Sequence, residues 1–533
     1  MNSLFTTPLD EGIASLWARI PASYKKAFYW LVLIHLLAFG FEMTNLTLHH
    51  DDLVQIFIQD TILGHYLGRF GTGWLHYYTQ GAYFMPFWQM SQAIVLMSLY
   101  GLVVAHLWGM RRILDAALIG AILVIFPYMA HVYQYNTTMA TYTVAHLLAA
   151  LAILLSIKAR TWAVLLAAAC HFFAFSIYQS VANNAAAIFL FWLLLQWVCP
   201  PSPDEAGQRP APWRSTVATL IAVLVGGLLY VAAVKSMDIS FGDYQGAGQA
   251  FDLGKGFDPV LALRAVFEGS RAFYLWPEHY FPSALKALQI VLLAGAAGLC
   301  LLQPRGWTHK IAAVGLLALA AISPRFLQML HPHGHYHQLT LTAYAVVVAG
   351  ATAVILRAPW IWSANGARVF SIILILGYLV QCNWISTVNL LNTQAHFHTL
   401  GQILARLRSL PPDAWDGQTV LVVGRYDMAR EHPYKPATGV ASRYMDAGHM
   451  DLMARLLREP IRFSSGDRHP QANAYALSHP AWPAAQSVGA LDGHAIVVLS
   501  LPAEGQALDG SSEAPKGHAV ERSQPLRHEV GED

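Results

Sequence analysis

Charged residues are scarce in this chain. Asp, Glu, Lys and Arg make up 12% of its 533 residues, whereas hydrophobic residues make up 55%. Soluble globular domains carry about 25% charged residues. The composition therefore excludes an ordinary soluble domain and predicts a polytopic membrane protein, for which length is no guide to the number of domains.

Excess positive charge and cysteine are also scarce. The net formal charge is +2, and no basic tract or alternation of basic and aromatic residues is present, so we expect no nucleic-acid partner. The four cysteines all lie within or at the ends of apolar runs, which argues against a disulfide framework, and their pattern fits no zinc site. They are Cys170, Cys199, Cys300 and Cys382.

Two organisational features are missing as well. Lys25 and Lys26 precede the first apolar run, but no small-residue cleavage site follows it, so we expect this run to act as an uncleaved insertion signal. There is no internal repeat, and the apolar runs are nearly free of charge at their centres. Both observations argue against a transporter built from two similar halves.

Long apolar runs dominate the chain instead. A helix needs about 20 mostly apolar residues to span a membrane, and eleven segments meet this requirement or come close to it. They lie near residues 27–43, 91–110, 113–131, 143–157, 162–181, 185–199, 215–234, 285–303, 310–328, 338–356 and 368–386. The predicted fold is an all-α polytopic membrane protein with about 11 transmembrane helices.

Lys and Arg in the short connections predict the orientation of these spans. Most of them fall on one side, whereas the short loops of the other side contain only Arg69 and Arg325. The N-terminus is therefore predicted to be cytoplasmic and, with an odd number of spans, the C-terminus to be outside. The basic residues on the predicted cytoplasmic side are Lys25, Lys26, Arg111, Arg112, Lys158, Arg160, Arg209, Arg214, Arg305, Lys310, Arg357 and Arg368.

The longer loops then lie on the outer face. Within the first of them, residues 53–63 and 74–90 have apolar residues at a helical period, and we expect two helices in the membrane interface. The loop at 235–284 is rich in glycine before a helical pattern at 259–274, which would suit a mobile flap over a site.

The composition changes after residue 387. Residues 418–424 and 494–500 are typical of short buried strands, and residues 450–458 of a helix between them. We therefore expect four parts. They are a cytoplasmic segment at 1–26, a transmembrane domain at 27–386, a small extracytoplasmic α/β domain at 387–502, and a tail at 503–533 with too few apolar residues to fold.

An acidic pair, Asp51 and Asp52, follows the first span. Carboxylates at a membrane surface are costly to desolvate, so they need partners or a role. One interpretation is a cap on the following helix, where carboxylates favour the free N–H groups. The other is catalytic, with one carboxylate abstracting a proton from an acceptor hydroxyl and the other orienting it or holding a cation.

Basic residues of the outer face are candidates for binding phosphate, because guanidinium groups match phosphate oxygens. Arg69 and Arg325 stand out against the charge asymmetry, and Arg271 is a weaker candidate in a long loop. For Arg69 the alternative is a salt bridge to Asp51, Asp52 or Asp60.

Two further groups are candidates for a sugar or acceptor pocket. Tyr178 and Gln179 end the fifth span, where they would recognise hydroxyl groups or act as interfacial anchors. His333 and His335 belong to a run of four histidines at 331–337. Histidines at this spacing can bind zinc, but Pro332 and Gly334 favour an irregular loop, so polar packing or pyrophosphate contact is the preferred interpretation and no metal is expected there.

Four features together resemble the bacterial glucosyl transferases of the GtrII type, within the GT-C class of polytopic transferases. They are residues 45–52 with their Asp-Asp end, Gly68-Arg69, Ile-Tyr-Gln-Ser at 177–180, and Pro324-Arg325. The resemblance extends over residues 27–400, although the histidine run does not match the family's pattern.

The resemblance implies an enzyme of the bacterial inner membrane. It would transfer a hexose, glucose in the type case, from a polyprenyl-phosphate donor to a surface glycan such as lipopolysaccharide O-antigen at the periplasmic face. Asp52 or Asp51 would be the catalytic base, and Arg69 and Arg325 would neutralise the donor phosphate. No cofactor is required, although the acidic pair is compatible with a divalent cation.

We expect a single displacement, because a covalent intermediate needs a second carboxylate on the far face of the sugar, for which Glu268 is the one candidate identified in the sequence. The alternatives are a transporter or flippase of a lipid-linked sugar, and a glycan polymerase or ligase. A membrane anchor for the C-terminal domain would not need eleven spans.

Overall fold

The computed structural model describes residues 9–58, 67–81, 83–199, 210–239, 258–278, 281–332, 334, 336–428 and 444–501. The chain divides into two compact units. The first comprises Met1–His396 with Met428–Arg443, and the second comprises Phe397–Asp427 with Tyr444–Asp533. Each unit is described by itself.

The first unit is helical, and in its described residues nine helices are long and apolar enough to cross a membrane. A bent pair, α7 with α8, brings the count to ten. The nine are α2 (Ala22–Thr44), α6 (Pro86–Leu107), α9 (Met139–Ser156), α11 (Val181–Val198), α13 (Pro212–Ser236), α16 (Ser283–Leu302), α17 (Trp307–Ile322) with η3 (Ser323–Met329), η4 (Gln338–Leu341) with α18 (Ala343–Leu356), and α19 (Ile361–Arg408).

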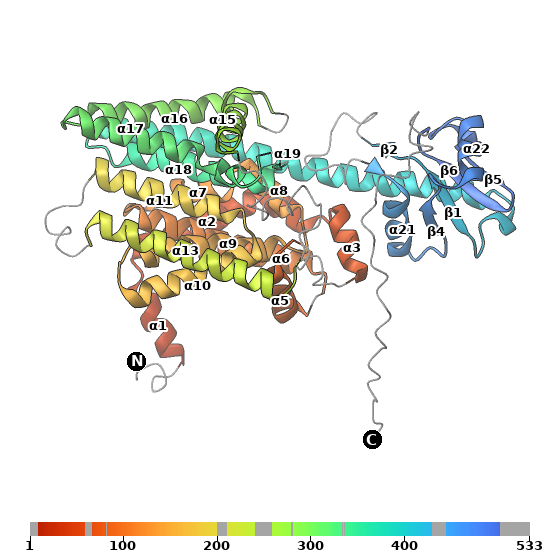
Figure 1. Cartoon of the computed structure of the whole chain (residues 1–533), viewed down its shortest axis with the longest axis horizontal. Coiled ribbons are helices and arrows are strands. Elements are labelled where there is room, and N and C mark those ends of the chain that lie inside the picture. The colour runs from red at the N-terminus through yellow and green to blue at the C-terminus, as the bar shows by residue number, and fades with distance from the viewer. Residues whose placement is uncertain are drawn as a thin grey trace, which may run out of the picture. The chain divides into compact units, whose positions relative to one another are not determined.

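The predicted membrane architecture is confirmed, with a count of nine to ten in place of about eleven. Each of the eleven predicted segments corresponds to an apolar helix or to the bent pair, but α10 (Thr161–Ile177) has 17 residues and is shorter than the others. A further helix, α1 (Leu9–Arg19), precedes the first span. Figure 1 shows α3 and α5 at one end of the first unit and α1 toward the other.

The bent pair consists of α7 (Ile113–Val124) and α8 (Pro127–Tyr133), which meet at an angle of 55°. Pro127 begins α8, and proline cannot donate the backbone hydrogen bond that would continue the preceding helix. The bend redirects the chain into the connection at 134–138, which faces the candidate site described below.

In its described residues, the connection from α2 to α6 contains two short helices, α3 (His50–Ile58) and α5 (Phe70–Gln80). The last residues of the first predicted interfacial helix, 59–63, lie outside the described residues. The second predicted helix, 74–90, is wrong, because α5 ends at Gly81 in the left-handed conformation and α6 begins at Pro86. A left-handed glycine ends a helix and a proline favours the first position of the next.

The predicted helix at 259–274 is confirmed as α15 (Pro259–Leu275). Its N-terminus is capped by Asp258, which accepts hydrogen bonds from the N–H groups of Val260 and Leu261. The glycine-rich residues 240–257 lie outside the described residues, so the predicted flap stays a prediction.

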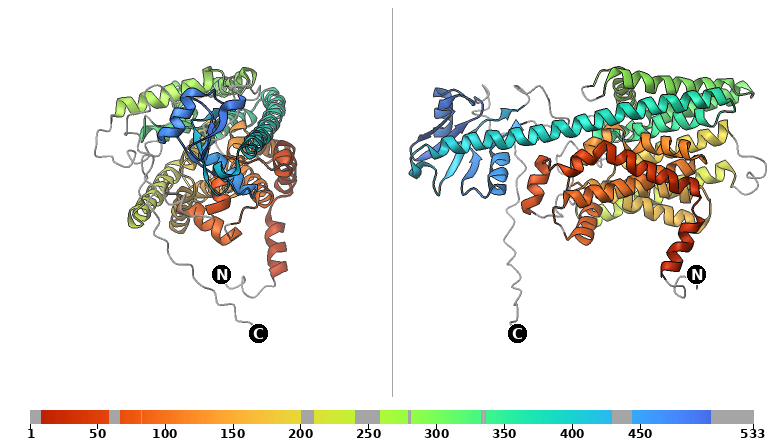
Figure 2. Two further views of the ribbon diagram at one scale, coloured as in Figure 1. Left: turned by 90° about the vertical axis from the view of Figure 1, so that its right-hand side faces the viewer. Right: turned by 180° about the vertical axis from the view of Figure 1, so that it is seen from behind.

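Small residues allow the helices to approach closely, as is common in membrane bundles. A Cβ atom placed on Gly101 of α6 would lie 2.9 Å from the Cα atom of Gly120 of α7. Helix α2 packs against both α6 and α7, and the right-hand view of Figure 2 shows α2, in red, along the near side of this unit. The connection from α2 to α6 therefore begins from a tightly packed group of three helices.

The second unit contains the small α/β region expected from the sequence. Its four-stranded sheet has the order β4-β1-β6-β5, with β1 parallel to both neighbours and β5 antiparallel to β6. The strands are β1 (Thr419–Val423), β4 (Arg462–Ser465), β5 (Val488–Leu491) and β6 (His494–Val498). The other elements are η5 (Pro412–Ala414), β2 (Tyr426–Asp427), β3 (Tyr444–Met445), α21 (Ala447–Leu456), α22 (Pro470–Ser478) and η6 (Ala485–Ser487).

Candidate active site

Asp52 is fully buried and accepts four hydrogen bonds. Its Oδ2 atom accepts from the backbone N–H of His49 (3.0 Å) and from Nδ2 of Asn136 (2.9 Å). Its Oδ1 atom accepts from the N–H and the hydroxyl of Thr137, both at 3.3 Å. Asp52 thus fastens the start of α3 to the α8–α9 connection.

The surroundings of Asp52 raise the pKa of its carboxyl group toward neutral pH. Burial raises the pKa of the carboxyl group to about 7, and the nearby charge of Asp51 adds to this, whereas the hydrogen bonds from Asn136, His49 and Thr137 lower it. Burial is the largest of these effects, because the charged form loses its hydration. The carboxyl group therefore exchanges its proton near neutrality.

The acidic pair also forms the local cap that the sequence allowed. His49 precedes α3, and its Nδ1 accepts a hydrogen bond from the N–H of Asp51 (3.3 Å). The carboxylate of Asp52 in turn accepts one from the N–H of His49. This reciprocal arrangement has the geometry of a capping box. Because Asp52 and His49 supply the cap, the carboxylate of Asp51, which is half-buried, is not needed for it.

Glu42, near the end of α2, is a buried carboxylate that our sequence interpretation missed. It accepts a hydrogen bond from the hydroxyl of Thr47 and interacts electrostatically with Asp52. The side chains of Ser386 and Asn389, both on α19, also interact with this carboxylate. An ionisable residue inside a predicted span is a functional signal by default, and this signal was available in residues 27–43.

Arg69, Tyr178 and Gln179 lie together, and their predicted roles as phosphate and sugar ligands stay predictions. Tyr178 is fully buried, and its hydroxyl donates to the carbonyl of Leu339 (2.9 Å). Arg69 precedes α5 and donates from Nη1 to the hydroxyl of Tyr142 (2.8 Å) and from Nε to Oε1 of Gln179 (3.3 Å). Its guanidinium carbon lies 5.1 Å from the ring centroid of Tyr178. The rings of Tyr142 and Tyr178 are stacked, with centroids 4.2 Å apart.

These contacts fix the guanidinium group in place. Nε2 of Gln179 donates to the carbonyl of Leu67 (2.8 Å) and to the hydroxyl of Tyr230 (2.8 Å), which itself donates to the carbonyl of Gly68 (3.2 Å). The side chain of Gln179 therefore holds the guanidinium group of Arg69 and also the backbone that precedes this residue. Sequence reasoning could not identify Tyr142 and Tyr230, because nothing near them in the chain indicates Arg69.

The segment at 136–142 contains hydrogen-bond partners of both Asp52 and Arg69. Asn136 and Thr137 bind Asp52, and Tyr142, at the start of α9, binds Arg69. Residues 136–142 therefore connect Asp52 to Arg69, although these two residues lie on separate elements of the α2–α6 connection. Short polar contacts of this kind are what a preorganised site requires.

Arg325 lies on η3, where its Nε donates to the hydroxyl of Tyr344 (3.3 Å). Asn183 holds the backbone of this turn by donating to the carbonyl of Pro324 (2.8 Å) and accepting from the N–H of Leu327 (3.3 Å). Arg271, the weaker phosphate candidate, is exposed on α15 and belongs to neither of the arginine-binding groups described above.

The predicted acceptor residues His333 and His335 lie outside the described residues. Within the described parts of the chain, no group of three or more His, Cys, Asp or Glu side chains is arranged to hold a metal ion. Among the described residues, Asp51 and Asp52 thus have no third side chain of these types placed to complete a metal site with them.

A second polar group that sequence reasoning missed surrounds Glu278. Its carboxylate accepts from the hydroxyl of Tyr128 (2.7 and 2.9 Å) and from Nε2 of Gln338 (3.2 Å), and pairs with Lys286 (3.3 Å). The Lys286 side chain is 5% exposed and the Glu278 side chain 26% exposed. Glu278 is therefore a partly accessible carboxylate that is held by a buried lysine and by polar side chains of α8 and η4.

An apolar pocket of about 470 Å³ lies between α5, α6 and α9. One wall contains Thr141, next to the Tyr142 that binds Arg69. The lining residues are Leu75, Thr79, Gln80, Trp88, Ser91, Gln92, Val95, Leu96, Ala140, Thr141 and Val144. The pocket is therefore lined in part by α5, whose N-terminus follows Arg69, and by α9, which carries Tyr142.

Comparison with known proteins decides the family. Residues 40–356 match the family model described as Glucosyl transferase GtrII, which is more than half of the chain. The chain belongs to the GtrII glucosyl transferase family. No curated protein and no solved structure matches it.

Membership of the GtrII family supports a glycosyltransferase activity of the glucosyl type. The matched region begins before Glu42 and ends with α18, so it contains the acidic pair, Arg69 and Arg325 but not α19 or the second unit. The candidate active site therefore lies wholly within the part of the chain that defines the family.

Proposed function

We propose that this GtrII-family protein transfers a glucosyl group from a polyprenyl-phosphate donor to a surface glycan, such as lipopolysaccharide O-antigen. The observation that supports the proposal most is the shared segment at 136–142, which binds a carboxylate and an arginine on separate elements. A transferase of this kind needs a base for the acceptor hydroxyl and a cation for the phosphate that leaves. The segment holds Asp52, which fixes the start of the helix that carries Asp51, and it also holds Arg69.

The structure favours different roles for the two aspartates. Asp52 is fully buried with both oxygens in use, so it acts as a positioning residue. Asp51 is half-buried and is not needed for the cap, so its carboxylate is the one that can reach an acceptor hydroxyl. Successive helical residues point in directions about 100° apart, which explains how one is buried while its neighbour stays accessible.

Arg69 and Arg325 are proposed to bind the donor phosphate. The Arg69 guanidinium is held by Tyr142 and Gln179 and packs on Tyr178, so it is oriented before the donor arrives. A fixed cation of this kind stabilises the charge that develops on the leaving phosphate. Arg271 is exposed, and the proposal assigns it no role in binding the donor.

The polyprenyl chain is proposed to occupy the pocket between α5, α6 and α9. This pocket is mostly apolar, and Thr141 in its wall neighbours the tyrosine that binds Arg69. Two of the three helices that line it also hold the arginine, because Arg69 directly precedes α5 and Tyr142 belongs to α9. Trp88, also in the wall, is half-exposed, as is typical of aromatic side chains at the interface.

The reaction is proposed as a single displacement. The acceptor oxygen forms a bond to the anomeric carbon, its proton passes to Asp51, and the bond from that carbon to the phosphate oxygen breaks, which releases polyprenyl phosphate. This balance needs no cofactor, although a divalent cation near Asp51 and Asp52 is compatible with it. Glu268, the other carboxylate considered from sequence, is exposed and pairs with Arg264.

The location follows from the charge asymmetry. The candidate site lies at the end of the bundle whose short connections contain few basic residues, so we propose that it faces the periplasm of a bacterial inner membrane, with the N-terminus cytoplasmic. A periplasmic second unit requires an odd number of crossings, and we propose that the bent pair and α10 both cross the membrane, which gives eleven. The bilayer supplies the lipid-linked donor.

The test replaces Asp51 by Asn and measures transfer of glucose from a synthetic polyprenyl-phosphate donor to the purified acceptor glycan, by mass spectrometry. We expect transfer to fall by about 10²–10⁴-fold, the usual contribution of a general base, at unchanged protein level. Glu268→Gln, which alters an exposed carboxylate on α15, is the control and should retain activity. Full activity of Asp51→Asn would refute this role. Absence of transfer by the wild type with every polyprenyl donor would favour the transport alternative.

A further inference from the structure

The first unit contains a pocket at the end opposite the candidate active site. At its start, α6 contacts the α8–α9 connection through Gln89, whose Nε2 donates to the carbonyl of Thr137 (3.0 Å). At its other end, α6 is followed by a pocket of about 310 Å³. The lining residues are Gly109, Met110, Arg111, Arg112, Asp115, Leu356, Arg357, Ala358, Pro359, Ile361, Ala364 and Arg368.

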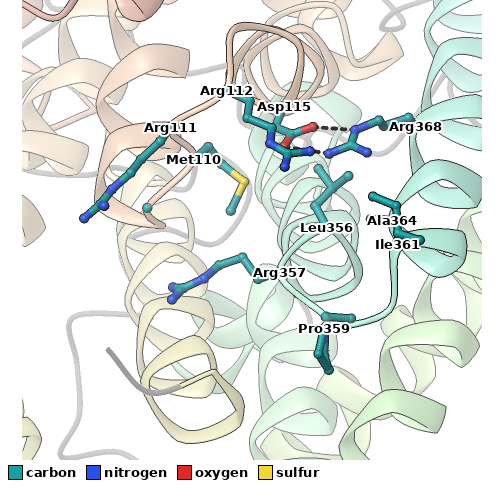
Figure 3. A pocket seen from close by; sticks show the side chains of 12 residues that line it. Met110, Arg111, Arg112, Asp115, Leu356, Arg357, Pro359, Ile361, Ala364 and Arg368 are labelled. Atoms are coloured by element: carbon teal, nitrogen blue, oxygen red, sulfur yellow. Dashed lines mark hydrogen bonds and ion pairs between the residues drawn. The ribbon is translucent and has the colours of Figure 1, made fainter. Parts of the chain in front are cut away.

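This pocket is strongly basic. Four arginines and one aspartate line it, which gives a formal charge of +3 in a chain whose total is +2. Figure 3 shows the Asp115–Arg368 pair at one side of the pocket and the side chain of Arg357 at another, with Met110 between them. Such a concentration of guanidinium groups favours an anion, and phosphate oxygens match their geometry best.

Two of the arginines are held in fixed positions. Arg368 donates from Nε and Nη2 to the two oxygens of the buried Asp115 (2.8 and 3.0 Å). Arg357 donates to the carbonyl of Trp108 (3.3 Å) at the end of α6 and to that of Cys199 (3.0 Å) after α11. These contacts build the walls of the pocket, whereas Arg111 and Arg112 are exposed at its mouth.

The pocket also has apolar walls and an aromatic neighbour. Met110 and Leu356 are buried beside the arginines, and Ile361 at the start of α19 is 62% exposed. Trp360 and Trp362 adjoin the lining, with ring centroids 6.4 Å apart, and Trp362 is 70% exposed. Exposed tryptophans next to a membrane helix are typical of the headgroup region, so the pocket lies at that depth.

We propose that this pocket binds the phosphate group of an anionic phospholipid. The ligand combines a phosphate, for the arginines, with acyl chains, for the apolar wall and the exposed start of α19. The general bias of basic residues toward one membrane face explains exposed arginines, but it does not require a pocket whose walls are two arginines fixed by an aspartate and by helix ends. The proposal is independent of the transferase function.

The experiment uses the full chain purified in detergent and offers it equal amounts of phosphatidylglycerol and phosphatidylcholine with the same acyl chains. Retained lipid is counted by native mass spectrometry. We expect preferential retention of phosphatidylglycerol, reduced by about fivefold for each of Arg111→Gln and Arg112→Gln, the effect of one basic residue at an anionic surface. Arg214→Gln, an exposed arginine at the start of α13 at the same end, is the control.

Further variants and conditions decide among the outcomes. Arg112→Lys keeps the charge and should retain most of the preference, which also shows that replacing this side chain does not unfold the protein. Equal retention of phosphatidylglycerol by the wild type and by the double variant Arg111→Gln/Arg112→Gln would overturn the proposal. Displacement of the lipid by millimolar inorganic phosphate would overturn the lipid assignment and leave a soluble phosphate ligand.

Discussion

Replacing Asp52 by Asn tests the account of the acidic pair most directly. The change keeps the shape of the side chain but removes its charge and turns one acceptor oxygen into an N–H₂ group. All four groups around Asp52 can donate, and three of them can only donate: the N–H of His49, Nδ2 of Asn136 and the N–H of Thr137. The Asn side chain therefore leaves at least one buried donor facing another, which costs about 1–3 kcal/mol.

Removal of the Asp52 charge has the opposite effect on stability, because a buried charge is costly. The size of this effect depends on pH. A pKa raised from 3.8 to about 7 means that the native state holds its proton more tightly than the unfolded state does. The stabilisation from this proton is fully present below pH 3.8 and is lost as the pH rises through 7. This stabilisation amounts to at most about 4 kcal/mol. The Asp52→Asn variant, whose amide does not titrate, should show no such loss.

We therefore expect the two proteins to differ most at low pH. At pH 5 the Asp52→Asn variant should be the less stable, and between pH 5 and 8.5 the wild type should lose about 2–3 kcal/mol relative to it. The titratable groups that face Asp52 are Asp51, Glu42 and His49. They are the same in both proteins, so the difference between the two curves reports mainly Asp52.

The assay is thermal unfolding of the purified proteins in detergent across this pH range, with Glu268→Gln as the control for an exposed carboxylate. The melting temperatures of wild type and Asp52→Asn should converge or cross as the pH rises. A constant difference from pH 5 to 8.5 would refute the claim that Asp52 is buried with a raised pKa. If Asp52→Asn lost all transfer at unchanged stability, Asp52 would be the base and Asp51 would not.

Other consequences concern the two remaining polar groups and the packing of α5. Glu278→Gln should destabilise the protein by about 3 kcal/mol, because it leaves Lys286 buried without a charge partner; a melting temperature equal to that of the wild type would show that the pair is not buried. Arg69→Lys should lower kcat/KM about 10–100-fold, since a single ammonium cannot keep both contacts of the fork; Tyr142→Phe, which keeps the guanidinium, should lose less. Gly71→Ala should destabilise by about 1–3 kcal/mol, because its Cβ atom would clash with a serine hydroxyl oxygen of α10; normal stability would contradict this packing.

The local features of the fold could be predicted because they depend on local composition. Apolar runs gave the helices of the membrane unit, and short Val-rich runs gave β1 and β6 of the second unit. The helix predicted at 74–90 was wrong, although Gly81 and Pro86 were visible in the sequence as breaking signals. The apolar period continues across these two residues, but their backbone preferences decide where the chain leaves the helix.

The site was only partly predictable, because its contacts join distant parts of the chain. Asp52 and Arg69 stood out by charge, but Asn136 and Tyr142 are ordinary polar residues until the fold brings them to those charges. Glu42 is hidden in composition, because it is a single carboxylate near the end of the apolar run at 27–43. An ionisable residue within a span has to be explained in its own right, since its desolvation is costly wherever it lies.

The division of labour between the two aspartates explains why a pair is present at all. A helix cap needs one carboxylate at the third position, and Asp52 fills this place while also binding Asn136 and Thr137. That burial removes Asp52 from the reach of a substrate, so chemistry at this point of the chain needs a second carboxylate that the same helical turn directs elsewhere. Asp51 is in that position, next to a carboxyl group that can give up or accept its own proton near pH 7.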